Sequence, residues 1–152
     1  MPQGPLSKIK NGSRLTANYT NATNGLTAVG LGWQIGANEV WTGEFNLSGQ
    51  CSGTGGTKFA ITIPAGATIE AEFLGITSAV TALTSSRVTA SATVTAQTFW
   101  TAAAVPGPVW IRVTVVNGST AGSVALEAES VTNGQTTTIF AGSYVTCRET
   151  AN

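Results

Sequence analysis

The alternation of apolar and polar residues is the feature that most restricts how this chain can fold. In residues 40–48, Trp41, Phe45 and Leu47 fall on one face and polar side chains fall on the other. Residues 58–63 alternate in the same way. A period of two is typical of a strand with one solvated face, and no stretch has a convincing helical period of 3.6. Both runs are therefore predicted to be β-strands.

The glycine-rich segment between these two runs, residues 49–57, is predicted to be a hairpin loop. It holds four glycines. Such a loop can bind phosphate when it contains Gly-Lys-Ser/Thr and opens a helix. Here Gly56, Thr57 and Lys58 open a strand instead, which favours the hairpin.

Further alternating runs and turn signals such as Asn117-Gly118 extend the pattern along the chain. The expected strands are residues 13–19, 26–35, 40–48, 58–64, 68–76, 85–96, 109–117, 123–130, 136–141 and 143–148. About nine or ten short strands, spaced roughly 8–12 residues apart, indicate a sandwich or a barrel. We expect an all-β fold, a single-domain antiparallel β-sandwich over residues 13–150. A polar arm at residues 1–12 precedes it, and is expected either to be a floppy terminus or to order against a neighbouring subunit.

Length and charge argue against several classes of protein. At 152 residues the chain can bury a core of its own. The formal net charge is zero and 9% of the residues are charged, which argues against a nucleic-acid partner and against a polybasic membrane surface. No apolar run reaches the length of a bilayer span. Residues 1–10 lack the apolar segment of a secretory signal, so synthesis in a cytoplasm is expected.

The residue types that are missing limit the chemistry further. The chain contains no His and no Asp, so a Ser-His-Asp or Cys-His catalytic site cannot form within it. Two cysteines cannot fill a four-ligand zinc site, and neither a metal nor a cofactor is expected. Cys51 and Cys147 are expected to remain thiols, with a disulfide as the alternative.

Paired glutamates are the catalytic pattern that remains. Glu70 and Glu72 share a strand face, roughly 6.5–7 Å apart along it, and glycoside hydrolysis can use two carboxylates at about that separation. A solvated strand face is the more common reason for such a pair, and the same holds for Glu127 and Glu129. No enzymatic activity is therefore expected.

The chain holds four tryptophans, at positions 33, 41, 100 and 110. One small core need not bury all four, and aromatic residues are enriched at interfaces, so burial in the core and exposure at an interface both stay open. In the expected strand at residues 109–117, Trp110 and Val116 share the face opposite the main apolar one. This suggests that the second face is at least partly covered too.

Several of these features occur in a recognisable order from Ser13 to Arg148. They are Arg14-Leu15-Thr16, the apolar strand at 31–35 with Gly36-Ala37-Asn38 after it, the aromatic strand at 40–47, the Gly/Thr-rich loop at 52–57, the strand ending at Pro64, the acidic strand Leu126-Glu127-Ala128-Glu129, and Ala141-Gly142-Ser143-Tyr144 near the end. In this order the chain resembles a family of small tailed-bacteriophage virion proteins with a TNF-like jelly-roll fold. The resemblance implies a jelly-roll topology and brings no catalytic residues with it.

The resemblance implies a structural role on a virion. Such proteins resemble capsid decoration proteins and the tip domains of tail appendages, and both kinds commonly form homotrimers. A short arm and a single domain favour a decoration protein on the capsid surface, made in the host bacterial cytoplasm. Its expected partners are itself, as a homotrimer, and the major capsid protein, with no nucleic acid and no membrane. A receptor- or glycan-binding tip domain is the alternative, and an enzyme is a distant third.

Two places are expected to make these contacts. Contacts with the capsid or a neighbouring subunit are expected in the arm, at Pro5, Leu6, Lys8, Ile9 and Lys10. A subunit interface is expected at Trp100 and Trp110.

Overall fold

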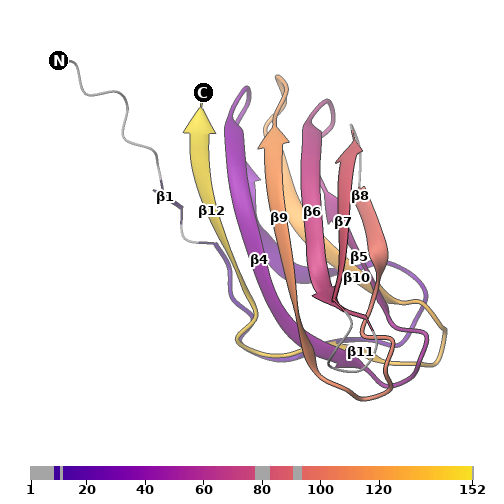
Figure 1. Ribbon diagram of the computed structural model, residues 1–152. Helices are drawn as coiled ribbons and strands as arrows, with labels where there is room; N and C mark the ends of the chain where they lie inside the picture. Colours follow the sequence, from indigo (N-terminus) through magenta and orange to yellow (C-terminus); the bar gives the residue numbers. More distant parts are fainter. Residues whose placement is uncertain (1–8, 11, 78–82, 91–93, 152) are drawn as a thin grey trace.

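Two antiparallel β-sheets packed face to face make up the protein, as shown in Figure 1. The computed structural model describes residues 9–10, 12–77, 83–90 and 94–151. Within this described part no residue is helical. The predicted all-β sandwich is therefore confirmed.

The larger sheet contains eight strands. They are β1 (Ile9–Lys10), β2 (Tyr19–Asn21), β4 (Val40–Cys51), β6 (Thr68–Ile76), β7 (Leu83–Ala90), β9 (Gly107–Val116), β11 (Thr137–Ile139) and β12 (Tyr144–Ala151). Their order is β1-β12-β4-β9-β6-β7, and β11 pairs with both β4 and β2. The centre of the sheet is the long pair of β4 and β9, which runs from Val40 opposite Val116 to Gly49 opposite Gly107.

The smaller sheet lies behind the larger one in Figure 1. Its four strands are β3 (Thr27–Ile35), β5 (Thr57–Thr62), β8 (Val94–Phe99) and β10 (Gly122–Ser130), in the order β3-β10-β5-β8. Among the described strands of both sheets, β6 and β7 are the one pair of consecutive strands that are hydrogen-bonded to each other. Almost every pairing in the fold thus joins segments that are far apart in sequence.

A single apolar core fills the space between the sheets. Its largest fully buried side chains include Trp41, Trp100, Phe45, Phe59, Phe73, Phe99, Leu31 and Ile111. Two glycines on the inner face of β4 make room for aromatic rings. A Cβ atom at Gly43 would overlap the ring of Trp33, and one at Gly49 would lie 2.6 Å from Cη2 of Trp100. These glycines therefore allow close packing across the sandwich.

The glycine-rich segment after β4 is not a hairpin loop, contrary to the prediction. β4 belongs to the larger sheet and β5 to the smaller one, so the segment crosses from one sheet to the other. Gln135 holds it in place, because its Oε1 accepts a hydrogen bond from the backbone N–H of Gly55 at 2.8 Å. Alternation gave both strands an apolar face, but it could not show that these faces oppose each other across the core.

Two further predicted strands are wrong in their extent. The segment 85–96 was predicted as one strand, but it contributes to β7 and β8, which lie in different sheets. The predicted strand at 13–19 is largely loop, in which Arg14 makes an isolated bridge to Tyr144 and β2 begins only at Tyr19.

Part of the predicted arm belongs to the larger sheet. β1 pairs with the edge strand β12, with Ile9 opposite Arg148 and Lys10 opposite Cys147. The other predicted contact positions, Pro5, Leu6 and Lys8, lie outside the described residues.

The cysteines are too far apart to be joined. Cys147 on β12 is opposite Gly43, whereas Cys51 lies eight residues further along β4, which corresponds to roughly 26 Å. A disulfide requires Cα atoms within about 7 Å. Both residues are buried thiols, so the prediction that they do not form a disulfide is confirmed.

Candidate interaction surface on the larger sheet

The outer face of the larger sheet carries exposed aromatic, apolar and charged side chains next to one another. Along β9 the alternation directs Ile111 and Val113 into the core and leaves Trp110, Arg112 and Thr114 exposed. The same alternation in β4, β6 and β12 directs every second side chain outward, beside the exposed side chains of β9. The strand registers then arrange them in rows that run across the four strands.

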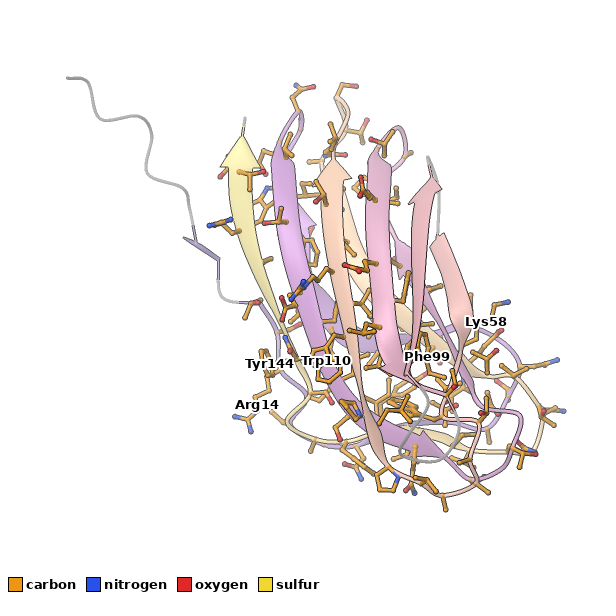
Figure 2. The ribbon with its side chains drawn as sticks, viewed as in Figure 1. Arg14, Lys58, Phe99, Trp110 and Tyr144 are labelled. Carbon is orange, nitrogen blue, oxygen red and sulfur yellow. The ribbon has the colours of Figure 1, made fainter. Side chains whose placement is uncertain are left out.

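The first of these, the aromatic row, consists of Tyr144, Asn46, Trp110 and Leu74 on β12, β4, β9 and β6. Tyr144 is 43% exposed, and Trp110 and Leu74 are each 37% exposed. Figure 2 shows Tyr144 and Trp110 at a similar height on this side of the molecule. Large apolar side chains that share one row and remain exposed are a feature of interaction sites.

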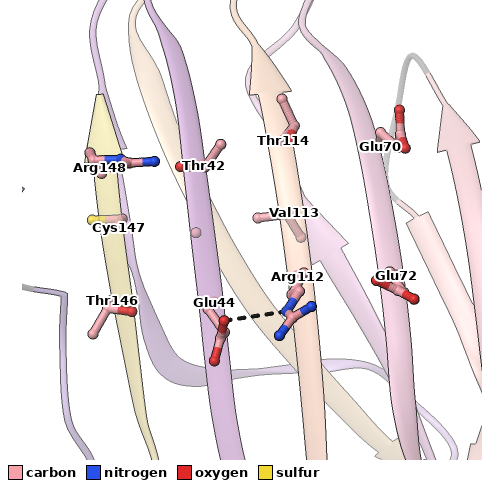
Figure 3. A pocket seen from close by; sticks show the side chains of 11 residues that line it. Thr42, Glu44, Glu70, Glu72, Arg112, Val113, Thr114, Thr146, Cys147 and Arg148 are labelled. Carbon is pink, nitrogen blue, oxygen red and sulfur yellow. Dashed lines mark ion pairs between the residues drawn. The ribbon is translucent and has the colours of Figure 1, made fainter. Parts of the chain in front are cut away.

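The next two rows carry the charges of this face. The charged row is Thr146, Glu44, Arg112 and Glu72, and the threonine row is Arg148, Thr42, Thr114 and Glu70. Figure 3 shows both rows. They line a shallow depression with a volume of about 530 Å³.

Arg112 is the central charge of the depression. Its Nε lies 3.4 Å from Oε2 of Glu44 on the neighbouring strand, and Glu72 is opposite it on the other side. The Arg112 side chain is 71% exposed, so its guanidinium remains accessible to a partner. An exposed ion pair of this kind contributes little to folding stability, about 0–1 kcal/mol. The arrangement is therefore better suited to recognition than to holding the fold together.

The chemistry that these rows offer is binding chemistry. The charged and threonine rows supply carboxylates, guanidinium groups and hydroxyls, and the aromatic row supplies a flat apolar surface. Glu70 and Glu72 share this face, as predicted, and both are exposed. Among the described residues, no group of three or more side chains could hold a metal ion.

The structure separates the two tryptophans of the predicted subunit interface. Trp110 is exposed on the outer face, as an interface residue should be. Trp100 is 1% exposed, and its indole Nε1 donates a hydrogen bond to the carbonyl of Gly107 at 3.0 Å. Trp100 therefore does not fit that prediction, because the protomer itself already surrounds its ring. Trp33 and Trp41 are buried as well.

No described residue covers the second face of β9. We expected partial cover there because Trp110 and Val116 are apolar, but Val116 is 47% exposed. In the described structure the smaller sheet packs against the opposite face of β9, since it is the inner side chains that are buried. Among the described residues, none covers this outer face, and its side chains are available to a partner.

The outer face of the smaller sheet has a different character. Lys58 Nζ lies 3.8 Å from Glu129 Oε1 across β5 and β10. Small side chains such as Ala28, Ala60 and Ala125 occupy neighbouring positions. The described side chains of this face include no large exposed aromatic group, so it is the weaker candidate for an interface.

A comparison of the chain with protein-family models, curated proteins and solved structures found no match. In the described part of the chain, we found no helix with the length and apolar character needed to cross a membrane. The function must therefore be argued from the surface itself.

Sequence reasoning singled out Trp110 but missed most of its neighbours. Tyr144, Leu74 and Arg112 come from three different segments, and their proximity depends on pairings between distant strands. Alternation could have shown that each side chain points away from the core. No local signal could have shown that they share one row or one depression.

Proposed function

We propose that this chain is a structural virion protein of a tailed phage, which decorates and stabilises the capsid by binding the major capsid protein as a homotrimer. The observation that carries the proposal is the exposed aromatic row beside the charged and threonine rows on one sheet face. Such a face suits association with another protein, because aromatic residues and Arg contribute strongly at interfaces. Binding to the folded shell would stabilise it by mass action.

The strand order supports the jelly-roll topology that belongs to this proposal. Eight strands, β1, β3, β4, β5, β8, β9, β10 and β12, can be numbered one to eight along the chain. The larger sheet then has the order 1-8-3-6 and the smaller sheet 2-7-4-5. The first strand lies beside the last. Among these eight strands the chain changes sheet at every step except between the fourth and the fifth, which pair in the smaller sheet, as in the two Greek keys of a jelly roll. The hairpin of β6 and β7 extends the larger sheet at one edge.

The arm supplies the first test of the capsid contact. A variant lacking residues 1–8 keeps Ile9 and Lys10, which pair with β12, so its thermal unfolding should match that of the full chain. Its co-sedimentation with expanded capsids that lack the protein should be weaker if residues 1–8 contact the shell. Equal co-sedimentation of the two chains would show that residues 1–8 do not contribute to capsid binding.

Localisation on the particle tests the proposal as a whole. An antibody to the purified protein should label the heads of intact virions under the electron microscope. Label at the tail tip would contradict decoration, and virions without label would contradict a virion role altogether.

The second candidate is a receptor- or glycan-binding tip, and one observation favours it. Trp110 borders a smaller depression of about 290 Å³ together with Leu74, Glu72, Glu44 and Arg112. An exposed aromatic face can stack on a sugar ring while the carboxylates accept hydrogen bonds from its hydroxyls. Binding of host-surface polysaccharide that is lost in Trp110→Ser would support this candidate over decoration.

A further inference from the structure

We propose that two copies of this chain pair through the outer faces of their larger sheets, around a two-fold axis that runs parallel to the strands between β4 and β9. The proposal goes beyond capsid decoration, because it concerns contact between copies and needs no capsid. A face paired in this way is not free for the capsid or for a trimer contact, so in the paired state a capsid contact falls to the arm at residues 1–8. A two-fold contact joins the same surface of both copies, so that surface must be complementary to itself. The rows described above meet this requirement.

Four of the five charged residues in the two rows face an opposite charge under this rotation, and Glu72 faces Thr146 of the partner subunit. The rotation places β4 over β9 of the partner subunit and β12 over β6, and it keeps each row over itself. In the charged row, Glu44 then faces Arg112 of the partner subunit. In the threonine row, Arg148 faces Glu70 of the partner subunit. Because each contact occurs twice, opposite charges meet in four places.

The aromatic row is partly complementary to itself in the same arrangement. In the aromatic row, Tyr144 faces Leu74 of the partner subunit, and Trp110 faces Asn46 of the partner subunit. Pairing would thus cover the three most exposed apolar side chains of the row. Loss of this exposed apolar surface to water favours association.

Three alternative axes place like charges together. An axis along β4 sets Glu44 opposite its own copy, and an axis along β9 does the same for Arg112. An axis perpendicular to the strands, between the charged and threonine rows, sets Glu72 opposite Glu70 of the partner subunit. Like charges that face each other across an interface are unfavourable. An axis between β9 and β6 also brings opposite charges together, with Arg112 over Glu72 of the partner subunit, but it leaves β12 with Tyr144 and Arg148 without a facing strand. Charge and coverage together therefore favour the axis between β4 and β9.

The size of the face indicates a weak dimer. Four strands about 4.8 Å apart and three rows about 6.8 Å apart cover roughly 400 Å² of sheet. This is below the roughly 800 Å² per partner of a standard interface, so we expect dissociation on dilution in the micromolar range. Twisted sheets pack at about −30°, so the match is closest near the axis. The long side chains of Arg148 and Glu70 allow for the offset at the edges.

Reciprocal charge reversal tests the two-fold contact. Arg148→Glu alone, or Glu70→Arg alone, places like charges together at two points of the dimer. An equimolar mixture of the two variants restores opposite charges at both points, as does the double variant. Sedimentation of the full chain from roughly 1 µM to 1 mM should show a monomer–dimer equilibrium. We expect each single variant to weaken dimerisation at least about tenfold, and the mixture to recover it.

The result for the mixture is the decisive one. Recovery of dimerisation in the mixture cannot be explained by contacts that a side chain makes within its own chain. Glu70 already has such an interaction, so a loss seen in Glu70→Arg alone has a second explanation. Matched controls are Lys58→Glu and Glu127→Arg, which make the same charge changes on the outer face of the smaller sheet. Both controls should dimerise like the unchanged chain, and near-ultraviolet circular dichroism should show that all variants are folded.

Three results would overturn the two-fold contact. They are an unchanged chain that stays monomeric up to 1 mM, single variants that dimerise normally, and a mixture that fails to recover. A trimer that is insensitive to these charge reversals would also overturn it, while leaving capsid decoration intact. Capsid decoration is judged by labelling and co-sedimentation instead, so the two proposals fail separately.

Discussion

Gly43 shows at the scale of a single residue how this sandwich is packed. It lies on the inner face of β4, where a Cβ atom would overlap the ring of Trp33 from the opposite sheet. Glycine is a poor strand former, so its presence in the longest strand has a packing reason rather than a conformational one. The indole Nε1 of Trp33 is buried without a hydrogen-bond partner. This indicates that the Trp33 ring serves to fill space in the core rather than to form a hydrogen bond.

We predict that Gly43→Ala destabilises the protein by about 1–3 kcal/mol, because the added methyl overpacks the core against Trp33. The measurement is urea-induced unfolding. Combining the change with Trp33→Leu should give back part of this loss, since the two sites are in contact and their effects are not additive.

Gly25→Ala is the matched control for Gly43→Ala. Apart from the adjacent residues, Oγ1 of Thr23, at 3.8 Å, is the one described atom within 4 Å of a Cβ atom at Gly25. Its stability should stay within about 0.5 kcal/mol of the unchanged chain. Equal losses at Gly25 and Gly43 would contradict the packing explanation.

The crossing segment between β4 and β5 is the informative unit at the scale of elements. A glycine-rich connection between sheets has little side-chain packing of its own, so its backbone needs partners elsewhere. Gln135 supplies a partner for Gly55, and Thr136 supplies partners for Ser52, whose N–H donates to the Thr136 carbonyl and whose Oγ accepts from the Thr136 N–H. The segment before β11 therefore anchors the crossing.

We predict that Gln135→Ala speeds amide hydrogen exchange at Gly55 while lowering global stability by only about 1 kcal/mol. The hydrogen bond from Gly55 and a weak one from the Cys51 thiol, at 4.0 Å, are lost in a surface segment. Exchange measured by NMR should show the change near Gly55 and leave the centre of β4 and β9 protected. A uniform rise across the sheet would instead mean that the crossing segment is part of the global unfolding unit.

Non-local strand pairing dominates at the scale of the whole molecule. β4 pairs with β9, β11 and β12, which all come much later in the chain, and β3 pairs with β10. Loop-closure entropy must be lost before such pairings form, and proteins of this kind fold slowly for their size.

We predict refolding on the scale of milliseconds to seconds, followed by stopped-flow tryptophan fluorescence after dilution from denaturant. Three of the four tryptophans are buried between the sheets, so their signal reports assembly of the core. Complete refolding within microseconds would contradict the non-local topology, because only local contacts form that quickly.

The sequence by itself determined the all-β class, most strand positions and the side of each strand that faces the core. These follow from a period of two, which is a local property of a few residues. It also identified Trp110 as a residue on the second face of β9. The error at residues 85–96 has the same origin, because alternation continues through a segment that the structure divides between two sheets.

Only the tertiary structure decided which strands are neighbours, and with that the candidate site. The glycine-rich segment connects the two sheets and is not a hairpin, because the inner faces of β4 and β5 oppose each other across one core. Trp100 became a core residue because its ring packs beside Gly49 and bonds to Gly107. The rows of the outer face exist because distant strands pair in a fixed register, and register depends on long-range hydrogen bonds and packing that no local pattern encodes.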